Sequence, residues 1–405
     1  MRKQLWTRLT AAALAALLTA ALPTGISAAA QEDTAPPVEE TPLTEILPAE
    51  PQSPQETPDE PDTPSAEEPT PVPQEIPLTE ILPVESLAQA TAENAAGAEV
   101  PYLDEDGAPQ SVPSATPVTD NDTAWDNGWY VAQDSITIHS RVTVSGDVRL
   151  ILADGCELTI DGGIQVAHPN SLTIYGQSEG NGELTATAPA ESNIYHAAIG
   201  GSTNVQIWEV NYCGSVTING GDVTATGGDA SSGIGGGPVS GGKIVINGGT
   251  VTATGGNNAA GIGGGMQGNG GSVTINGGEV TATGGNQAAG IGSGTMGGRI
   301  QIQINGGTVN ATGGSQGAGI GDGMECSNDG SITITGGTVT ATGGYQGTGI
   351  GGGAKTPGGK ITISGGTVTA NGADGASGIG HGGLGATGGE ITISGGTVTA
   401  TGGAG

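Results

Sequence analysis

The stretch SVTINGGEVTATGGNQAAGIGSG, residues 272–294, holds one complete unit of a motif that fills the C-terminal half of this chain. Apolar and polar residues alternate over 272–276 and again over 279–283. Alternation with a period of two, built on β-branched residues, predicts a strand with one buried and one solvated face. The pair Gly277-Gly278 between them supplies the positive φ that a tight corner needs. We therefore predict two short strands around a glycine corner, and a third strand-like point at Ala289–Ile291.

This unit recurs seven times with nearly constant spacing. The second glycine of the corner pair lies at Gly221, Gly249, Gly278, Gly307, Gly337, Gly366 and Gly396. The steps between these positions are 28, 29, 29, 30, 29 and 30 residues, and no window of helical periodicity occurs in the repeats. A period this regular predicts a solenoid.

Among solenoids and related repeat folds, the period and composition favour a parallel β-helix. Propeller blades need about 40 to 50 residues, and leucine-rich repeats need leucines, whereas Leu384 is the only leucine after Gly214. Collagen needs glycine at every third position. We predict an all-β, right-handed parallel β-helix with about 29 residues per coil and coils stacked about 4.8 Å apart.

The repeats provide a thin core of small side chains. One column of buried residues is expected from the first strands, at Ile218, Ile246, Ile275, Ile304, Ile334, Ile363 and Ile393. Pairs such as Val280 and Ala282 are expected to be buried in the second strands. The chain has no Phe, and Tyr345 is the one aromatic residue in the repeats. One coil buries too little apolar surface to be stable alone, so stability has to come from stacking.

Two segments precede the folded part. Residues 1–30 are typical of a signal peptide, with Arg2 and Lys3 before a short apolar run and small residues at its end. Residues 31–110 contain 20 of the 40 acidic residues, 16 of the 23 prolines and no Lys or Arg, which predicts a disordered acidic, proline-rich spacer. The formal net charge of -31 argues against nucleic acid and anionic membranes as partners. We expect secretion or attachment to a cell surface, without membrane insertion after cleavage of the leader.

Residues 111–213 predict an N-terminal cap and irregular coils of the same β-helix, ahead of the seven repeats in 214–405. Strand-like segments occur at 135–138, 148–152, 157–160 and 171–174, and aromatic residues are concentrated here. Terminal coils of solenoids are atypical because they close an open core. The aromatic residues therefore predict a cap; if a glycan is bound, Trp125, Trp129 and Tyr130 are the candidates, because rings stack on sugar faces.

The cysteines predict neither a disulfide framework nor a metal site. Cys213 and Cys326 lie four coils apart, about 19 Å at the usual coil spacing, far beyond the reach of a disulfide. A bond between Cys156 and Cys213 stays open. No Cys and His spacing matches zinc, and the glycine-rich turns lack the regular Asp of calcium-binding β-rolls. We expect no cofactor.

A catalytic β-helix of the pectin lyase or polygalacturonase kind is the main alternative. Such sites need several carboxylates with Arg, Lys or His on neighbouring coils. Asp322, Glu325 and Asp329 form the only acidic cluster in the repeats, and Gly380-His381-Gly382 resembles a polygalacturonase motif. His381, however, occupies a turn position and has no paired aspartates, so a non-catalytic protein is predicted.

Four segments carry a family resemblance: Gly128–Val131, Val142–Cys156, Asn170–Gln177 and the repeats themselves. Over about residues 125–405 the chain resembles secreted surface proteins of Gram-positive, largely anaerobic bacteria with a pectin-lyase-like β-helix. The resemblance implies an adhesin-like or carbohydrate-binding rod, with glycans or a host or cell-wall surface as partner. Members often carry wall-attachment signals; this chain stops mid-coil at Thr401–Gly405, which suggests a fragment. Oligomeric state is not predicted.

Outward-facing threonines form the last feature. Alternation that buries the valines of the second strands places threonines on one flat outer face. The candidates are Thr252, Thr254, Thr281, Thr283, Thr340 and Thr342. Such arrays resemble ice-binding surfaces, which makes ice or a crystalline polysaccharide a conceivable ligand. The alternative is that threonine is simply a favourable exposed strand residue.

Overall fold

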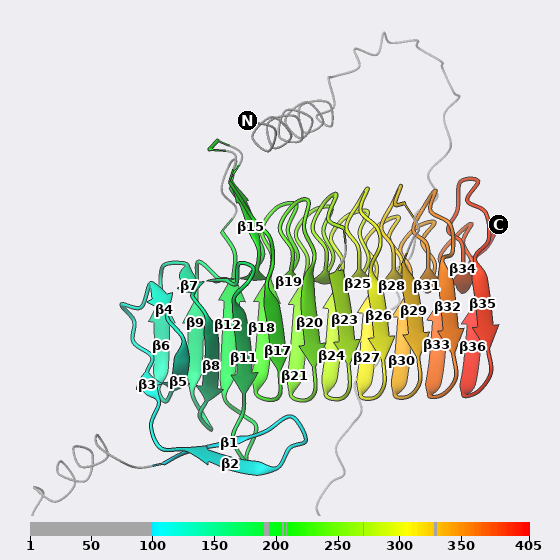
Figure 1. Ribbon diagram of the computed structural model, residues 1–405. Helices are drawn as coiled ribbons and strands as arrows, with labels where there is room; N and C mark the ends of the chain where they lie inside the picture. Colours follow the sequence, from blue (N-terminus) through cyan, green and yellow to red (C-terminus); the bar gives the residue numbers. More distant parts are fainter. Residues whose placement is uncertain (1–98, 190–193, 205, 208, 270, 328–329) are drawn as a thin grey trace, which may run out of the picture. The chain divides into compact units, whose positions relative to one another are not determined.

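The computed structural model describes residues 99–405 except 190–193, 205, 208, 270 and 328–329. The described residues contain strands and turns only, wound into a parallel β-helix (Figure 1). This confirms the predicted fold class. The predicted signal peptide at 1–30 and the predicted spacer as far as residue 98 lie outside the described residues. Within the described part, no helix has the length and apolarity needed to cross a membrane.

Three long parallel sheets form the walls of the helix, and each coil adds one strand to each sheet. Sheet 1 contains β3 (Thr116–Pro117), β5 (Gly128–Ala132), β8 (Asp147–Leu152), β11 (Ser171–Tyr175), β17 (Ser215–Ile218), β20 (Gly242–Ile246), β23 (Gly271–Ile275), β26 (Gln301–Ile304), β29 (Ser331–Ile334), β32 (Lys360–Ile363) and β35 (Glu390–Ile393).

Sheet 2 contains β6 (Ser135–Ile138), β9 (Glu157–Ile160), β12 (Glu183–Thr187), β18 (Asp222–Thr226), β21 (Thr250–Thr254), β24 (Glu279–Thr283), β27 (Thr308–Thr312), β30 (Thr338–Thr342), β33 (Thr367–Asn371) and β36 (Thr397–Thr401). Sheet 3 has two-residue strands: β4 (Ala124–Trp125), β7 (Val142–Val144, one residue longer), β10 (Ile164–Gln165), β14 (Ile199–Gly200), β19 (Ile234–Gly235), β22 (Ile262–Gly263), β25 (Ile291–Gly292), β28 (Ile320–Gly321), β31 (Ile350–Gly351) and β34 (Ile379–Gly380).

The core is a set of columns in which each residue stacks on its counterpart one coil away. Ile246 pairs in register with Ile218 and Ile275, and Val280 with Val251 and Val309. The predicted buried columns are confirmed except on the two C-terminal edge strands, β35 and β36; on β36, Ala400 is exposed. Ile393, on the edge strand β35, is half exposed because no further described strand of sheet 1 covers it.

Glycine is required in sheet 3 by the closeness of neighbouring coils. Gly292 has φ +144°, and a Cβ placed there would lie deep inside the contact distance of the Gly321 carbonyl oxygen in the next coil. The Gly-Ile-Gly motif thus brings backbone against backbone, and only the intervening isoleucine reaches the core. This is the physical reason for the third strand-like point of each repeat.

At the corner between sheets 1 and 2, amide side chains form a ladder. Asn247 donates from Nδ2 to Asn219 Oδ1 at 2.8 Å, Asn276 to Asn247 at 2.7 Å, and Asn305 to Asn276 at 2.8 Å. Thr335 continues the ladder, since its Oγ1 donates to Asn305 Oδ1 at 2.9 Å. Each rung links two coils outside the apolar core.

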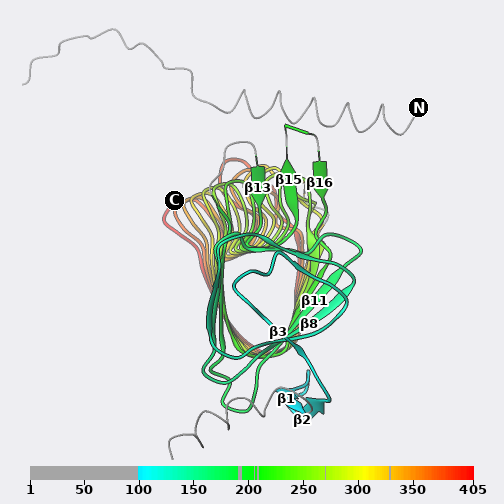
Figure 2. The same ribbon diagram turned by 90° about the vertical axis from the view of Figure 1, so that its left-hand side faces the viewer.

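The N-terminal coils carry two additions that the sequence did not predict. The antiparallel hairpin of β1 (Val100–Leu103) and β2 (Pro109–Val112) packs on the outside of sheet 1. The predicted spacer boundary at 110 was therefore wrong for residues 100–110. A small antiparallel sheet of β13 (Ile194–His196), β15 (Ser202–Asn204) and β16 (Glu209–Asn211) projects from a loop on the opposite side (Figure 2).

Candidate functional site

Three aromatic rings and one arginine gather on the outer face of sheet 1, beside the hairpin. Tyr102 comes from β1, Trp129 from β5 and Tyr175 from β11. The ring centroids lie 4.9 Å apart for Tyr102 and Trp129, 4.9 Å for Tyr102 and Tyr175, and 5.2 Å for Trp129 and Tyr175. The Arg149 guanidinium carbon lies 5.5 Å from the centre of the Trp129 ring. We call these four residues the ring platform.

Strand alternation explains why these side chains point outward. On β5, Trp129 pairs in register with Arg149 of β8, while the next residue, Tyr130, pairs with Leu150 and faces the core. Likewise Tyr175 pairs with Ile151, one residue after the buried Ile174. The platform is therefore assembled from three coils and the hairpin, which are separated in sequence but adjacent in space.

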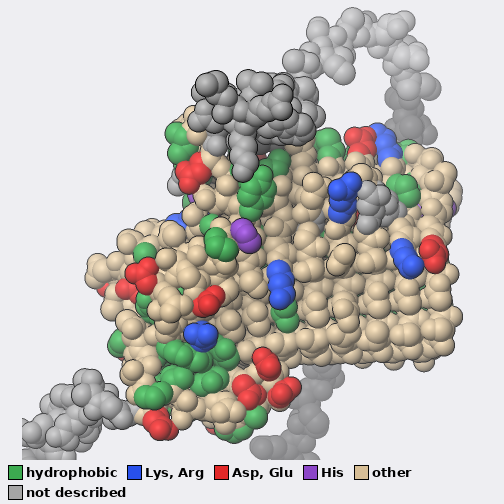
Figure 3. Space-filling model, in the orientation of Figure 1, with side chains coloured by type: hydrophobic (Ala, Val, Ile, Leu, Met, Phe, Trp, Pro, Cys, Tyr) green, Lys and Arg blue, Asp and Glu red, His purple; other side chains and the backbone are tan. Residues whose placement is uncertain are grey.

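The hairpin fixes the platform and covers the apolar surface next to it. Leu103 N donates to Gly176 O at 2.9 Å, and Gln177 Nε2 donates to Pro101 O at 2.8 Å. Beneath the hairpin, Val131 and Ile151 are buried although they lie on the outer side of sheet 1. Figure 3 shows apolar side chains gathered over this end of sheet 1, whereas the rest of the visible wall is mostly polar and neutral.

Each platform ring is partly exposed, so it can contact a ligand. Burial raises the pKa of Tyr175, with Tyr102 acting in the same direction and Arg149 opposing it. The phenol therefore keeps its proton at neutral pH and can donate a hydrogen bond. The three rings are tilted against one another by 34 to 70°, so they form an uneven aromatic surface that, with a guanidinium and phenol hydroxyls beside it, offers apolar and polar contacts at one place.

The three glycan-binding candidates from the sequence fall on different sides of the wall. Trp129 lies in the platform. Trp125 has no exposed surface; its Nε1 donates to Asp122 Oδ2 at 2.8 Å, and its ring lies 5.7 Å from that of Tyr130. Tyr130 packs against the core and accepts a hydrogen bond from Asp126 N at 2.9 Å. Trp125 was thus a wrong candidate for surface contact, because it and Tyr130 close the core.

The threonine candidates lie on the outer face of sheet 2. Thr252, Thr254, Thr281 and Thr283 are exposed, and their counterparts on β30 are partly exposed. These counterparts on β30 are Thr340 and Thr342. Register is exact along the sheet, since Thr252 pairs with Thr281 and Thr254 with Thr283. The predicted flat array of threonines is present.

The acidic residues noted in the repeats do not converge. Asp322 is buried, and its Oδ1 accepts a hydrogen bond from Ser293 Oγ at 2.8 Å. Glu325 instead points outward and pairs with Lys355 Nζ at 2.6 Å. Asp329 lies outside the described residues. The predicted cluster of three carboxylates is therefore not assembled by the described atoms.

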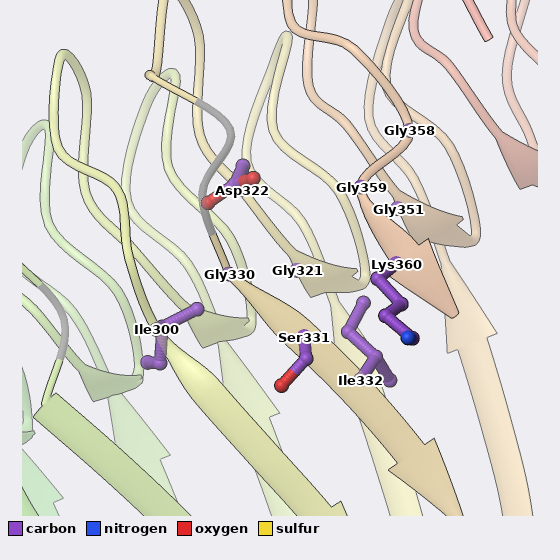
Figure 4. A pocket seen from close by; sticks show the side chains of 10 residues that line it. All are labelled: Ile300, Gly321, Asp322, Gly330, Ser331, Ile332, Gly351, Gly358, Gly359 and Lys360. Carbon is purple, nitrogen blue, oxygen red and sulfur yellow. The ribbon is translucent and has the colours of Figure 1, made fainter. Parts of the chain in front are cut away.

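Asp322 borders a cavity of about 10 Å³, room for roughly one water molecule, at the edge of sheet 1 (Figure 4). Lys360 and Ser331 also line it. Burial raises the pKa of Asp322 to about 6, against the hydrogen bond from Ser293, and burial raises the pKa of Cys326 to about 12. Cys326 Sγ lies 3.4 Å from Ser293 Oγ, so this is a buried polar cluster with an unreactive thiol.

His381 lies apart from these groups. It is partly buried, and its Nδ1 lies 3.1 Å from the carbonyl oxygen of Gly382. Within the described residues, no group of three or more His, Cys, Asp or Glu side chains is arranged to hold a metal ion. The three cysteines, Cys156, Cys213 and Cys326, are all buried and free, so the Cys156 to Cys213 bond left open by the sequence is not formed.

Arg141 is a buried charged residue that the sequence analysis did not single out. It is largely buried and donates to backbone carbonyls on two coils, including Gly162 O at 2.9 Å and Ala197 O at 3.0 Å. Its burial lowers its pKa to about 9, and burial together with Arg141 lowers the pKa of His196 to about 4. These contacts clamp irregular coils together, so we assign Arg141 a structural role.

Comparison with known proteins agrees with the geometry of the repeats. The model of the beta helix repeat family matches seven segments: residues 216–238, 244–266, 273–295, 302–324, 332–354, 361–380 and 391–405. Most of these segments run from a strand of sheet 1 through sheet 2 and past sheet 3, which is one coil. Residues 216–405 thus carry beta helix repeats. Neither the curated proteins nor the solved structures gave a match to the chain.

Proposed function

We propose that this beta-helix repeat protein is a non-catalytic, secreted or cell-surface rod that binds carbohydrate through the ring platform. The observation that carries the proposal is the packing of Tyr102, Trp129 and Tyr175 at 4.9 to 5.2 Å between centroids on a wall with few charged side chains. The leader-like sequence at 1–30 supports export. An adhesin-like role follows if the glycan belongs to a host or cell-wall surface.

The chemistry of the platform suits a pyranose. The apolar face of a sugar ring stacks on an aromatic face, and pairs of stacked rings contribute about 1 kcal/mol beyond area burial. Arg149 and the Tyr175 hydroxyl lie at the same place and can bond sugar hydroxyls. Because the three rings come from separate elements held by hydrogen bonds, little ordering is needed on binding.

Binding of the full chain to immobilised polysaccharides tests the proposal. Trp129→Ala and Tyr175→Ala should each weaken binding at least about tenfold, since each removes a stacking face. Tyr345→Ala is the matched control, because Tyr345 is an exposed ring on a loop of a regular repeat, 56% exposed, and remote from the platform in sequence. Equal loss in the control, or unchanged binding in both platform variants, would contradict the proposal.

An assay for cleavage products distinguishes a polysaccharide-cleaving enzyme from the proposed non-catalytic binding protein. Incubation with pectins and other acidic polysaccharides should release no new reducing ends or unsaturated products. If cleavage does occur and is abolished by Asp322→Asn, Glu325→Gln or His381→Ala, the protein is a polysaccharide-cleaving enzyme and the non-catalytic proposal fails.

A further inference from the structure

The outer face of sheet 2 has an unusually uniform central column. One residue from each of ten neighbouring strands stands in register there, and nine of the ten are threonine. The column reads Thr137, Thr159, Thr185, Thr224, Thr252, Thr281, Asn310, Thr340, Thr369 and Thr399. We call this column the threonine face, together with the side chains two residues further along, which are Thr187, Thr226, Thr254, Thr283, Thr312, Thr342 and Thr401, with His139, Asp161 and Asn371 on the remaining three strands.

Strand propensity alone does not explain this uniformity. Threonine is favourable in any exposed strand, so the outer face of sheet 1 should be equally rich in it. The corresponding column of sheet 1 is mixed: Trp129, Arg149, Thr173, Thr217, Val245, Thr274, Gln303, Thr333, Thr362 and Thr392. Two walls of the same coils therefore differ, and only one of them is uniform.

Charge is also distributed unevenly beside the threonine face. The flanking outer column carries Glu157, Glu183 and Asp222 at its N-terminal end and Glu279 near its middle. At its C-terminal end it carries neutral residues, Thr308, Thr338, Thr367 and Thr397. Two copies joined face to face in the same direction would place Glu157 of one copy opposite Asp161 of the other, whereas two antiparallel copies place the flanking acids of each copy opposite threonines of the other.

We propose that the threonine face docks on the threonine face of a second copy of this chain, with the two β-helices antiparallel. Ten strands about 4.8 Å apart and about 16 Å long give a flat area of roughly 700 Å² per copy. Stable protein interfaces bury about 800 Å² per partner, so full overlap of the ten strands provides nearly a standard interface. A two-fold arrangement also makes the interface self-complementary, as homodimers require.

Side-chain chemistry fits contact between two such faces. Threonine is β-branched and restricted at χ1, so little entropy is lost when the array is covered. Within the described residues, the hydroxyls of the central column donate and accept no hydrogen bond from another side chain of the chain. They are available to pair across the interface. Neutrality matters because a net charge of -31 makes other faces repel one another.

Sedimentation of the full chain over micromolar concentrations is the first test. The wild type should dimerise, more strongly in salt because screening weakens repulsion between the acidic chains. The double variant Thr281→Glu/Thr340→Glu should raise the dissociation constant at least about a hundredfold, because it buries unpaired charges. Thr274→Glu/Thr333→Glu adds the same charge to sheet 1 of the same two coils and should leave the dimer intact. A monomeric wild type, or equal weakening by both pairs, overturns the proposal.

Crosslinking tests the orientation without relying on the stability of the charged variants. With full overlap of ten strands, the second strand of one copy faces the ninth of the other, so position 159 faces position 369. A mixture of Thr159→Cys and Thr369→Cys chains should give a disulfide-linked dimer, and neither variant alone should do so. Crosslinking within either single variant contradicts the antiparallel arrangement. A different result would assign the threonine face to another ligand. In that case the wild type stays monomeric and is removed from solution by a crystalline polysaccharide or by ice, and Thr281→Glu/Thr340→Glu no longer binds that solid.

Discussion

One surface column changes its chemistry between the two ends of the β-helix, and the change shows what each region is built for. In the N-terminal coils the column holds Val131, Ile151 and Tyr175. Ile174 and Ile218 are in register, so the residues that follow them, Tyr175 and Asn219, stand in the same column. From Asn219 onward the column is the amide ladder. Where a hairpin covers the wall, the column is apolar and aromatic; where nothing covers it, stacked amides satisfy one another.

The cores differ in the same sense. Irregular coils bury leucines such as Leu150 and Leu158, whereas the repeats bury only Val and Ile in the same two columns. A repeat must fit both neighbours, so its side chains are those that stack on copies of themselves. The N-terminal coils have unlike neighbours and can hold unlike side chains, which is why the candidate ligand site is found there.

The largest effect should come from adding one methyl group between two repeats. Gly292→Ala places a Cβ against the Gly321 carbonyl oxygen, a backbone atom that cannot move without shifting the next coil. We expect a loss of about 3 kcal/mol or more in unfolding free energy. Gly155→Ala, in an irregular coil, shares a positive φ but has nothing within 4 Å, and should cost about 1 kcal/mol.

Chemical denaturation of both variants measures this difference. Each variant is compared with the wild type at the same protein concentration, so that any self-association is held constant. Similar destabilisation by the two substitutions would mean that backbone conformation, and not the close approach of coils, requires glycine in sheet 3.

A smaller effect is expected from Asp322, which interrupts the regularity of its own column. Sister coils have Gly236, Gly264 and Gly352 at this position. Burial raises the pKa of Asp322 to about 6 in the folded chain, from an ordinary value of 3.8. The unfolded carboxyl therefore ionises first as pH rises, and the contribution of this group to stability is complete below about pH 4 and lost by about pH 6.

Unfolding measured at pH 4 and pH 7.5 for the wild type and Asp322→Asn isolates this contribution. The wild type should lose up to about 3 kcal/mol more than the variant over this range, from about two pKa units at 1.36 kcal/mol each. The variant should also be the more stable of the two at pH 7.5. An identical pH dependence in both chains would show that the buried carboxyl is solvated or paired at neutral pH.

The two regions also differ in how much of them the sequence predicted. Regular alternation and paired glycines located the strands of every repeat and the threonine face, because these depend on neighbours within one period. The ring platform depends on register between irregular coils and on a hairpin at 100–112. Trp129 was named, but Tyr102, Tyr175 and Arg149 were not, since they lie far apart in sequence. Alternation along 128–132 already placed Trp129 and Tyr130 on opposite faces, a signal that was available and not used.

The smallest effect should come from the amide ladder, which the sequence also shows as an Asn before four successive glycine pairs. Asn276 donates to Asn247 and accepts from Asn305, so Asn276→Ala removes two exposed hydrogen bonds. We expect a loss of about 1 kcal/mol in unfolding free energy, since net hydrogen-bond contributions are modest in water. Asn276→Thr should lose about half as much, because Thr335 shows that a hydroxyl at this position still donates to the preceding amide.

Thr274→Ala, two residues earlier with no side-chain partner among the described residues, is the control and should change stability by less than about 0.5 kcal/mol. A loss as small in Asn276→Ala as in the control would mean that the ladder only fills the corner, and that stacking of the apolar columns alone holds the repeats together.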